Sequence, residues 1–352
     1  MCWRLMKYSP LRNIGNTCYA NAVLNALFHC RRFREALLRE RDISPDNTDT
    51  SSTVEVPKKV WKRSLLAKLL CRRSAETETA TACVMAELTR LFTRMETERG
   101  SVSPRRFLEV LWERNRSLVP YTQEDAHEFL GSLLNTLDSV LMQRRLCSWV
   151  RGLFSGIVFS EIKCDNCCTV SKTKEPFLDL SLDVLENSSV FSCIAHKFGD
   201  EKMTEETSFF CAVCRSPQNA TRTTRLGSIP SVLVLHLKRF QYTEAGQTKL
   251  KACVVFPHHL RQDGMLYTLS SLVVHCGPSA QTGHYVCAAK TDAGGWILID
   301  DEKTEHIPEE ELARFYGGID TAREEPRHRT ETAYLLFFES SHFESSHFEA
   351  SH

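Results

Sequence analysis

The spacing of apolar residues changes near residue 150, and this constrains the fold of the 352-residue chain more than any other feature. Before that point, apolar residues recur at intervals of three and four, as in residues 129–137, which is typical of amphipathic helices. From residue 153 the spacing becomes that of short strands, such as SVLVLHLKRF and YTLSSLVVHC, separated by turn residues such as Gly294 and Gly295. We therefore expect an α+β protein with a helical first 145 residues and a mostly antiparallel sheet after them.

Composition and charge narrow the classes of protein to which the chain can belong. Its hydrophobic content of 42% can fill a core, and Lys plus Arg equal Asp plus Glu at 44 each, so no net charge attracts it to nucleic acid or to an anionic membrane. The N-terminus lacks a secretory apolar segment, and no stretch reaches the ~18 apolar residues of a membrane span. We expect a monomer of the cytoplasm, the nucleus or both, without membrane or nucleic-acid partners.

Fifteen cysteines in a long chain without a signal peptide are expected to be reduced thiols, and most of them to be small buried apolar residues. Two CxxC pairs stand apart, Cys164 with Cys167 and Cys211 with Cys214. Two such pairs in a sheet-rich stretch supply four thiolates for a tetrahedral Zn²⁺ ion. Because all four coordination positions are then filled, the zinc is expected to be structural, with no cofactor for catalysis. Cys168 is an adjacent extra thiol that leaves the register of the ligands open.

A candidate nucleophile lies in the segment LRNIGNTCYANAVLNAL, where Cys18 directly precedes an apolar helical pattern. The positive end of a helix favours a thiolate over a thiol, which makes such a cysteine reactive. Gly15 permits a tight turn before it, Asn16 and Thr17 are candidate caps, and the amide of Asn13 can point at a developing oxyanion. The alternative is a cysteine that only fills the first turn of a buried helix.

A thiolate nucleophile requires a base, and the base requires an orienting group. His284 follows a glycine and opens a strand, and a second strand ends with Asp300 and Asp301. An antiparallel pair joined through Gly294 and Gly295 would bring Asp300 beside the ring of His284. Taken singly, the histidine could be structural and the aspartates a turn, so their joint occurrence carries the prediction.

Six segments together resemble a known family. They are GNTCYANAVLNAL, QEDAHEFL at 123–130, LHLKRF at 235–240, GHYVCAAK at 283–290, WILIDD at 296–301 and AYLLFF at 333–338. In this order they resemble the motifs of the ubiquitin-specific proteases, a papain-like family of cysteine deubiquitinases. The resemblance covers residues 11–338.

The resemblance implies a catalytic domain over 11–338, with a helical thumb over about 11–145 and sheet-rich fingers and palm over about 150–338. The zinc ribbon would lie within 160–225. The implied reaction is hydrolysis of the isopeptide or peptide bond after the C-terminal glycine of ubiquitin, through a thioester. Cys18 corresponds to the nucleophile, His284 to the base, Asp300 to the orienting acid and Asn13 to the oxyanion donor. Asp301 matches a second acidic position whose share of that role stays open.

The family also binds the C-terminal tail of ubiquitin, and ubiquitin and ubiquitinated proteins are the partners that the resemblance implies. Asp125 and Glu128 match acidic positions that bind the arginines of that tail, since arginine pairs well with carboxylates. Phe240 and Tyr285 match aromatic positions that line the channel. The alternative for 124–128 is a solvated helix face.

Two other functions remain open at this point. One is a ubiquitin-binding protein of the same fold that lacks activity, although every catalytic residue type is filled. The other is a zinc-ribbon nucleic-acid binder, which would need a basic, aromatic surface near the CxxC pairs. Outside the domain we expect an N-terminal extension at 1–10, a surface insertion at 42–57 and a disordered tail with SSHFE repeats at 339–352.

Overall fold

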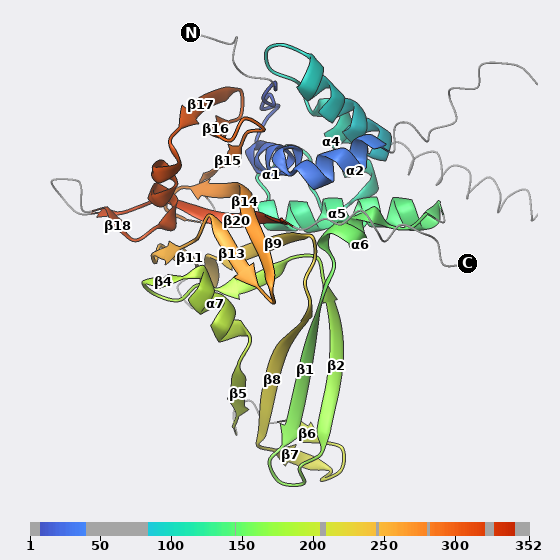
Figure 1. Ribbon diagram of the computed structural model, residues 1–352, viewed down its shortest axis with the longest axis vertical. Coiled ribbons are helices and arrows are strands. Elements are labelled where there is room, and N and C mark those ends of the chain that lie inside the picture. Colours follow the sequence, from blue (N-terminus) through green and yellow to red (C-terminus); the bar gives the residue numbers. More distant parts are fainter. Residues whose placement is uncertain are drawn as a thin grey trace, which may run out of the picture.

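A group of helices packs against a large β-sheet, and a long narrow sheet extends away from both (Figure 1). The computed structural model describes residues 8–39, 84–144, 146–204, 209–243, 246–279, 282–320 and 327–341. Helices dominate the described residues up to 154 and strands the rest, as the change in apolar spacing predicts. None of the helices in these ranges combines the length and the apolar character that crossing a bilayer requires.

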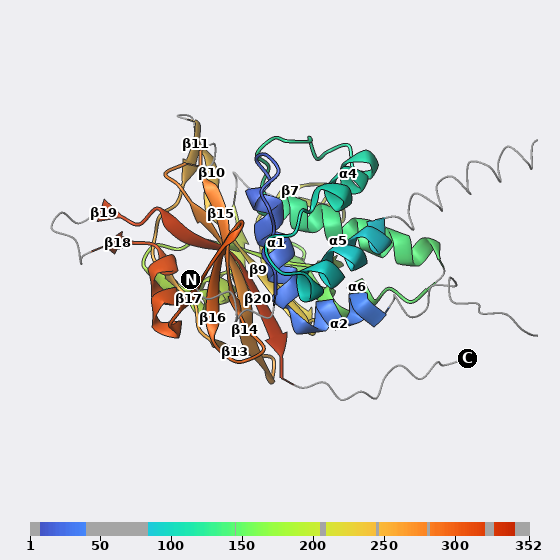
Figure 2. The ribbon, with the colours of Figure 1, turned by 90° about the horizontal axis from the view of Figure 1, so that it is seen from above.

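One helix of the helical layer, α1 (Cys18–His29), is buried along its whole length. The others are α2 (Arg31–Arg39), an unlabelled helix over residues 84–97, α4 (Arg105–Arg114), α5 (Ala126–Gln143) and α6 (Trp149–Phe154). Seen from above, α1 lies between the sheet and the remaining helices (Figure 2). A helix in this position has no solvent face, which explains its nearly continuous apolar sequence. The first turn of α1 thus lies where the two layers meet.

The large sheet has eight strands, seven of which follow one another in the order β17, β16, β15, β14, β20, β9 and β3, while β13 pairs with β14. Their bounds are β3 (Leu180–Asp183), β9 (Val232–Lys238), β13 (His259–Gln262), β14 (Met265–Cys276), β15 (His284–Lys290), β16 (Trp296–Asp300), β17 (Lys303–Ile307) and β20 (Glu331–Ser340). Only the pairing of β3 with β9 is parallel, so the predicted mostly antiparallel sheet is confirmed.

The middle of this sheet is covered on both faces, which explains its uninterrupted apolar runs. In β20, Leu335 and Phe337 pack in the core that contains α1. The alternate residues Leu336 and Phe338 belong to a second core with α7 (Val190–Lys197). Successive side chains of a strand point to opposite faces, so each apolar run supplies both cores.

The narrow sheet consists of β2 (Val170–Phe177), β1 (Gly156–Cys164), β8 (Ala220–Ser228) and β5 (Asp200–Met203), in that order. At its far end lies the short hairpin of β6 (Phe209–Cys211) and β7 (Ser216–Gln218) (Figure 1). The remaining elements are β4 (Ser188–Ser189), β10 (Phe240–Thr243), β11 (Gly246–Lys249), β12 (Val254–Val255), the 3₁₀ helix η4 (Glu309–Tyr316), β18 (Ile319–Asp320) and β19 (Arg327–His328).

The described ends of the chain extend beyond the boundaries expected at 11 and 338. The backbone N–H of Ser9 already donates to Met95 O at 2.8 Å. At the other end, β20 continues through Ser340, and the Glu339 carboxylate accepts hydrogen bonds from the backbone N–H groups of Arg31 and Arg32 at the start of α2. The expected insertion at 42–57 and the tail from residue 342 lie outside the described residues.

Candidate active site

Cys18 is the first residue of α1 and is only 3% exposed. Gly15 (φ +113°) and Asn16 (φ +53°) have left-handed backbone conformations that turn the chain into the helix. Thr17 occupies the N-cap position but makes no capping hydrogen bond through its side chain, so the expected cap is absent. No side chain at the N-cap position therefore offsets the partial positive charge of the first turn, in which Cys18 lies.

The imidazole of His284 lies between a sulfur and a carboxylate. Its Nε2 is 2.5 Å from Asp300 Oδ1, and its hydrogen bond with Cys18 is the largest cause of its raised pKa. Burial lowers the pKa of His284 and the bond to Asp300 raises it, so that it reaches about 9. The predicted antiparallel pairing of the two strands is confirmed, since β15 and β16 pair through Cys287 and Ile299.

Asp301 is a second carboxylate near the same ring, but it faces mainly toward α1. Its Oδ2 accepts from Asn13 Nδ2 and its Oδ1 from Asn21 Nδ2, each at 2.8 Å, while Oδ2 lies 3.9 Å from His284 Nε2. Its side chain is 14% exposed, compared with 45% for that of Asp300, and its backbone is left-handed (φ +50°). The two adjacent aspartates therefore have different surroundings and different partners.

Asn21 was not among the predicted site residues. It lies three positions after Cys18 in a mainly apolar helix, and it is 1% exposed. That buried polar residue, almost one helical turn from the candidate nucleophile, was the available signal, because residues three apart share a helix face. Its amide bonds to Asp301 and to the backbone oxygen of Arg12 at 3.3 Å.

The orientation of the Asn13 amide is determined by its oxygen. Asn13 Oδ1 accepts from the backbone N–H groups of Gly15 (2.9 Å) and Thr17 (3.3 Å), and from the Thr17 hydroxyl (3.3 Å). The amide nitrogen must then point the other way, toward Asp301. A primary amide nitrogen carries two hydrogens, so one remains for a further acceptor.

A cavity of about 320 Å³ opens beside Cys18. It is lined by all four residues predicted to contact a ubiquitin tail, Asp125, Glu128, Phe240 and Tyr285. Its other lining residues are Tyr19, Gln123, Glu124, Gln247, His275 and Gly283. Three carboxylates thus line one cavity, and Gln123 Nε2 contacts Gly283 O across it at 3.4 Å.

Asp125 has a structural role that the motif alone did not reveal. As the N-cap of α5 it accepts, through Oδ1, the backbone N–H groups of His127 and Glu128. Its Oδ2 accepts the hydroxyls of Tyr334 (2.6 Å) and Tyr285 (3.3 Å). Burial, reinforced by the charge of Asp125, raises the pKa of both tyrosines, so their phenols stay protonated donors.

A histidine pair below this cap was also missed by sequence reasoning. His127 Nε2 lies 2.8 Å from Asp179 Oδ2, and its ring stacks on His236 with centroids 3.8 Å apart and an interplanar angle of 16°. Burial and then the charge of His127 lower the pKa of His236 to about 3. Because ring nitrogens bind metals in the plane of the ring, two nearly parallel imidazoles cannot direct both lone pairs at one ion. The group Asp179, His127 and His236 is therefore poorly arranged for a metal.

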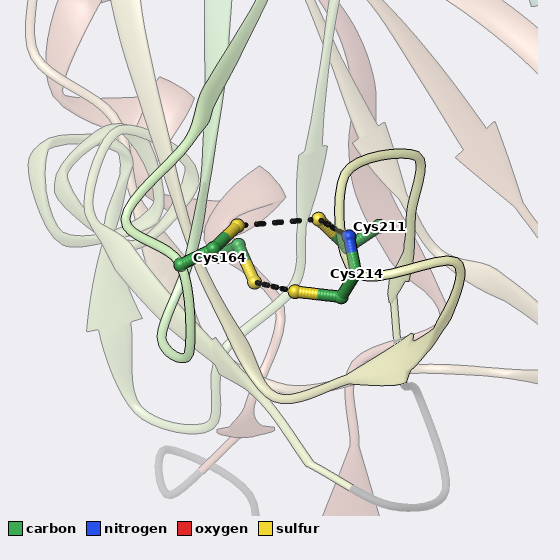
Figure 3. Close-up of side chains that lie close together, drawn as sticks. Cys164, Cys211 and Cys214 are labelled. Atoms are coloured by element: carbon green, nitrogen blue, oxygen red, sulfur yellow. Dashed lines mark hydrogen bonds between the residues drawn. The ribbon is translucent and has the colours of Figure 1, made fainter.

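The four predicted cysteine ligands converge at the tip of the narrow sheet. Figure 3 shows Cys164 facing the segment that carries Cys211 and Cys214. Cys167 Sγ is 3.5 Å from Cys211 Sγ, Cys164 Sγ is 4.0 Å from Cys214 Sγ, and all four sulfurs lie within 4.8 Å of one another. With metal–sulfur bonds of about 2.3 Å, sulfurs of a tetrahedral site lie about 3.8 Å apart, so this cluster can hold a metal ion.

The positions of the sulfurs show that Cys167, and not the adjacent Cys168, belongs to the cluster. Cys168 is exposed, has a left-handed backbone (φ +59°) and does not belong to the cluster. Its neighbour Cys167 supplies the sulfur instead, as the CxxC spacing indicates.

Comparisons with known proteins agree with this geometry. The family model described as ubiquitin carboxyl-terminal hydrolase matches residues 10–338. Ubiquitin carboxyl-terminal hydrolase 12 of Salmo salar is 33% identical over 369 residues, covering 95% of this chain and 90% of that protein. Ubiquitin carboxyl-terminal hydrolase 4 of Arabidopsis thaliana is 31% identical over 375 residues, covering 95% and 93%.

A solved structure supports the fold. The SAGA Ubp8/Sgf11/Sus1/Sgf73 DUB module bound to ubiquitin aldehyde matches with a TM-score of 0.70 and 23% identity, over 98% of this chain and 72% of that one. The expected papain-like architecture is thereby confirmed, with a helical thumb (α1 to α6), a palm (the eight-stranded sheet) and ribbon-like fingers (the narrow sheet). The chain belongs to the ubiquitin carboxyl-terminal hydrolase family and is a deubiquitinase of the cysteine type.

Proposed function

We propose that this enzyme hydrolyses the isopeptide or peptide bond after the C-terminal glycine of ubiquitin, with Cys18 as nucleophile, His284 as base and Asp300 as orienting acid. The observation that carries the proposal is the position of the His284 ring, 2.5 Å from Asp300 and near enough to Cys18 for that side chain to be the largest cause of its raised pKa. With its pKa raised to about 9, His284 is an imidazolium at neutral pH and stabilises a thiolate on Cys18.

Acylation begins when the Cys18 sulfur attacks the carbonyl carbon of the terminal glycine. The C–S bond forms, and the carbonyl electrons move onto the oxygen. His284 then gives its proton to the departing amine as the C–N bond breaks, which leaves a thioester on Cys18. Asp300 holds the imidazole in position through Nε2, so the other ring nitrogen, Nδ1, faces the reaction.

In deacylation the neutral imidazole of His284 takes a proton from water. The resulting hydroxide attacks the thioester carbonyl and the C–S bond breaks, which restores the thiolate and imidazolium. The C-terminal carboxylic acid of ubiquitin is released and gives its proton to the solvent. The remaining N–H of Asn13 stabilises the oxyanion in both steps. Asp301 supports this role by fixing the amides of Asn13 and Asn21.

The cavity beside Cys18 is proposed to receive the ubiquitin tail. Its acidic lining, Asp125 and Glu128 together with Glu124, favours the arginines of that tail, and Phe240 and Tyr285 add aromatic surface to the same cavity. Glu124 is an addition to the predicted residues. Because Asp125 already accepts four hydrogen bonds, we assign the direct arginine contact to Glu128 and regard Asp125 as the residue that orders this side of the cavity.

Zinc is the metal that we propose for the four-cysteine cluster. Cys164, Cys167, Cys211 and Cys214 would hold it as thiolates, which suit zinc and leave no open coordination position for chemistry. A bound Zn²⁺ ion would join the two knuckles of the fingers and stabilise them.

The test of the proposed function uses a fluorogenic amide on the C-terminus of ubiquitin. We expect the wild-type chain to hydrolyse it and Cys18→Ala to bind it without turnover. Binding without hydrolysis by the wild type would instead support an inactive ubiquitin-binding protein. A salt-dependent affinity for DNA, with no hydrolysis, would support the nucleic-acid binder. We propose action in the cytoplasm or nucleus as a monomer, which fractionation of cells and light scattering would test.

A further inference from the structure

A buried amine lies beneath the cavity, at Lys249, the last residue of β11. The residue is only 8% exposed. Its Nζ lies 2.8 Å from His275 Nδ1 and donates to three backbone oxygens, those of His275 (2.9 Å), Gly277 (3.0 Å) and Thr330 (2.7 Å). Burying an amine is unfavourable unless acceptors replace its water, and this group has four.

The three carbonyls that accept from Lys249 belong to residues at the end of β14 and just before β20. His275 and Gly277 flank Cys276, which is the register partner of His284 on β15 and of Glu331 on β20. Thr330 directly precedes β20. Lys249 therefore links the end of β14, the residue that follows it and the residue before β20. Cys276, at the end of β14, is also the residue that pairs with His284.

Gly277 and Gly283 each lie close to neighbouring backbone or to the His275 ring. Gly277 is left-handed (φ +149°), and a Cβ there would lie 2.5 Å from Thr282 O. A Cβ on Gly283 would lie 2.1 Å from His275 Nε2. Gly283 thus rests directly on the His275 ring, and the next residue is His284.

The His275 ring is contacted by the Lys249 amine and by two aromatic rings. Phe240 and Tyr285 meet it edge-on, with centroids 5.1 and 4.9 Å away. Burial, and then the charge of Lys249, lower the pKa of His275 to about 3, so the ring is neutral and its Nδ1 accepts from the amine. Burial also lowers the pKa of Lys249, to about 7, but both of its protonation states keep at least two N–H donors.

We propose that Lys249 is a positioning residue of the deubiquitinase reaction, which fixes the His275 ring and Gly283 and thereby places the His284 imidazole between Cys18 and Asp300. It acts through two contacts in sequence, from Lys249 to the His275 ring and from that ring to Gly283. The inference rests on the proposed function, because it assigns His284 as the base. Small displacements of a catalytic group from its reactive position reduce the rate steeply.

The test compares Lys249→Met, which keeps the apolar stem, with Lys249→Arg, which keeps donors for the same carbonyls. For Lys249→Met we expect a decrease in kcat of about tenfold or more on the ubiquitin amide, with KM within about twofold of wild type. The rate of labelling by an electrophilic ubiquitin C-terminal probe should also decline at a lower pH than in wild type, since His284 would lose the contacts that raise its pKa. Lys249→Arg should recover most of kcat.

The matched control is Lys290→Met at the opposite end of β15, which should behave as wild type. Wild-type kcat and an unshifted pH profile in Lys249→Met would overturn the proposal. The proposal would also be overturned if kcat decreased only in proportion to the amount of folded enzyme, which titration of reactive Cys18 measures. If Lys249→Met does not fold, Lys249→Gln is measured in the same way. An inactive wild-type chain would instead reject the proposed function itself.

Discussion

The Nε2 atom of His284 lies 2.5 Å from Asp300 Oδ1, whereas Asp301, the next residue, lies 3.9 Å away and binds the amides of Asn13 and Asn21. The backbone explains the difference, because Asp300 ends strand β16 and Asp301 turns into the left-handed region. Two adjacent carboxylates thus have different partners, which in the proposed mechanism are the base and the oxyanion donor.

This arrangement predicts different effects of the two aspartates. Asp300→Asn removes the negative partner of His284, so we expect a decrease in kcat of about a hundredfold or more, with the pH profile displaced to lower pH. Asp301→Asn should leave that profile in place and lower kcat through Asn13. If Asp301 acts through Asn13, the substitutions Asp301→Asn and Asn13→Ala impair the same function. The decrease in kcat of the double variant should then be much smaller than the product of the decreases in the two single variants. Independent effects in this cycle would contradict the assignment.

The charge of His284 links stability to pH. An exposed histidine has a pKa of about 6.5, and that of His284 in the folded protein is raised to about 9. The stabilisation is therefore complete below pH 6.5 and is lost as the pH rises through 9. We expect wild type to melt above His284→Asn at pH 6 and the difference to shrink by pH 10, in thermal unfolding at stepped pH. A difference in melting temperature that does not depend on pH would contradict the proposed interaction of a charged His284 with Cys18 and Asp300.

The fingers should depend on their metal. Removal of the ion by a chelator, or Cys211→Ser, is expected to lower the melting temperature by about 5 °C or more, because metal binding contributes directly to folding. Cys168→Ser is the matched control, since that exposed thiol lies outside the cluster, and it should melt as wild type does. Metal analysis of the purified protein identifies the ion. Equal melting curves for Cys211→Ser and Cys168→Ser would argue against a metal site.

Substitutions at Asp125 should separate its structural role from binding. Asp125→Ala loses the N-cap of α5, which alone destabilises by about 0.5–2 kcal/mol, and leaves two buried tyrosine hydroxyls without their acceptor. Asp125→Asn keeps a good cap, so urea unfolding should show a smaller loss. Glu128→Gln should not change stability but should raise KM for the ubiquitin amide several-fold, by about 1 kcal/mol, if it binds an arginine. An unchanged KM would indicate that a residue other than Glu128 binds the arginine.

Most of the fold could be predicted because it depends on residues close together in the chain. Apolar spacing separated helices from strands, the position of Cys18 before an apolar helix indicated the candidate nucleophile, and the glycines at 294 and 295 indicated the hairpin that carries Asp300. The CxxC spacing likewise predicted which four cysteines converge as candidate metal ligands, since each pair needs only one tight turn. The expected Thr17 cap was wrong because that hydroxyl bonds to Asn13 instead.

The sequence by itself determined the α+β class, the order of the elements and the residue types available for the reaction, because these follow from local spacing and chemistry. Only the tertiary structure decided which aspartate faces the imidazole, that Asn21 joins the site, and that Lys249 contacts the His275 ring. These contacts join residues as far apart as 21 and 301, and they form only when α1 docks on the sheet and each strand takes one register. No local pattern encodes such distances, since they arise from how the layers pack.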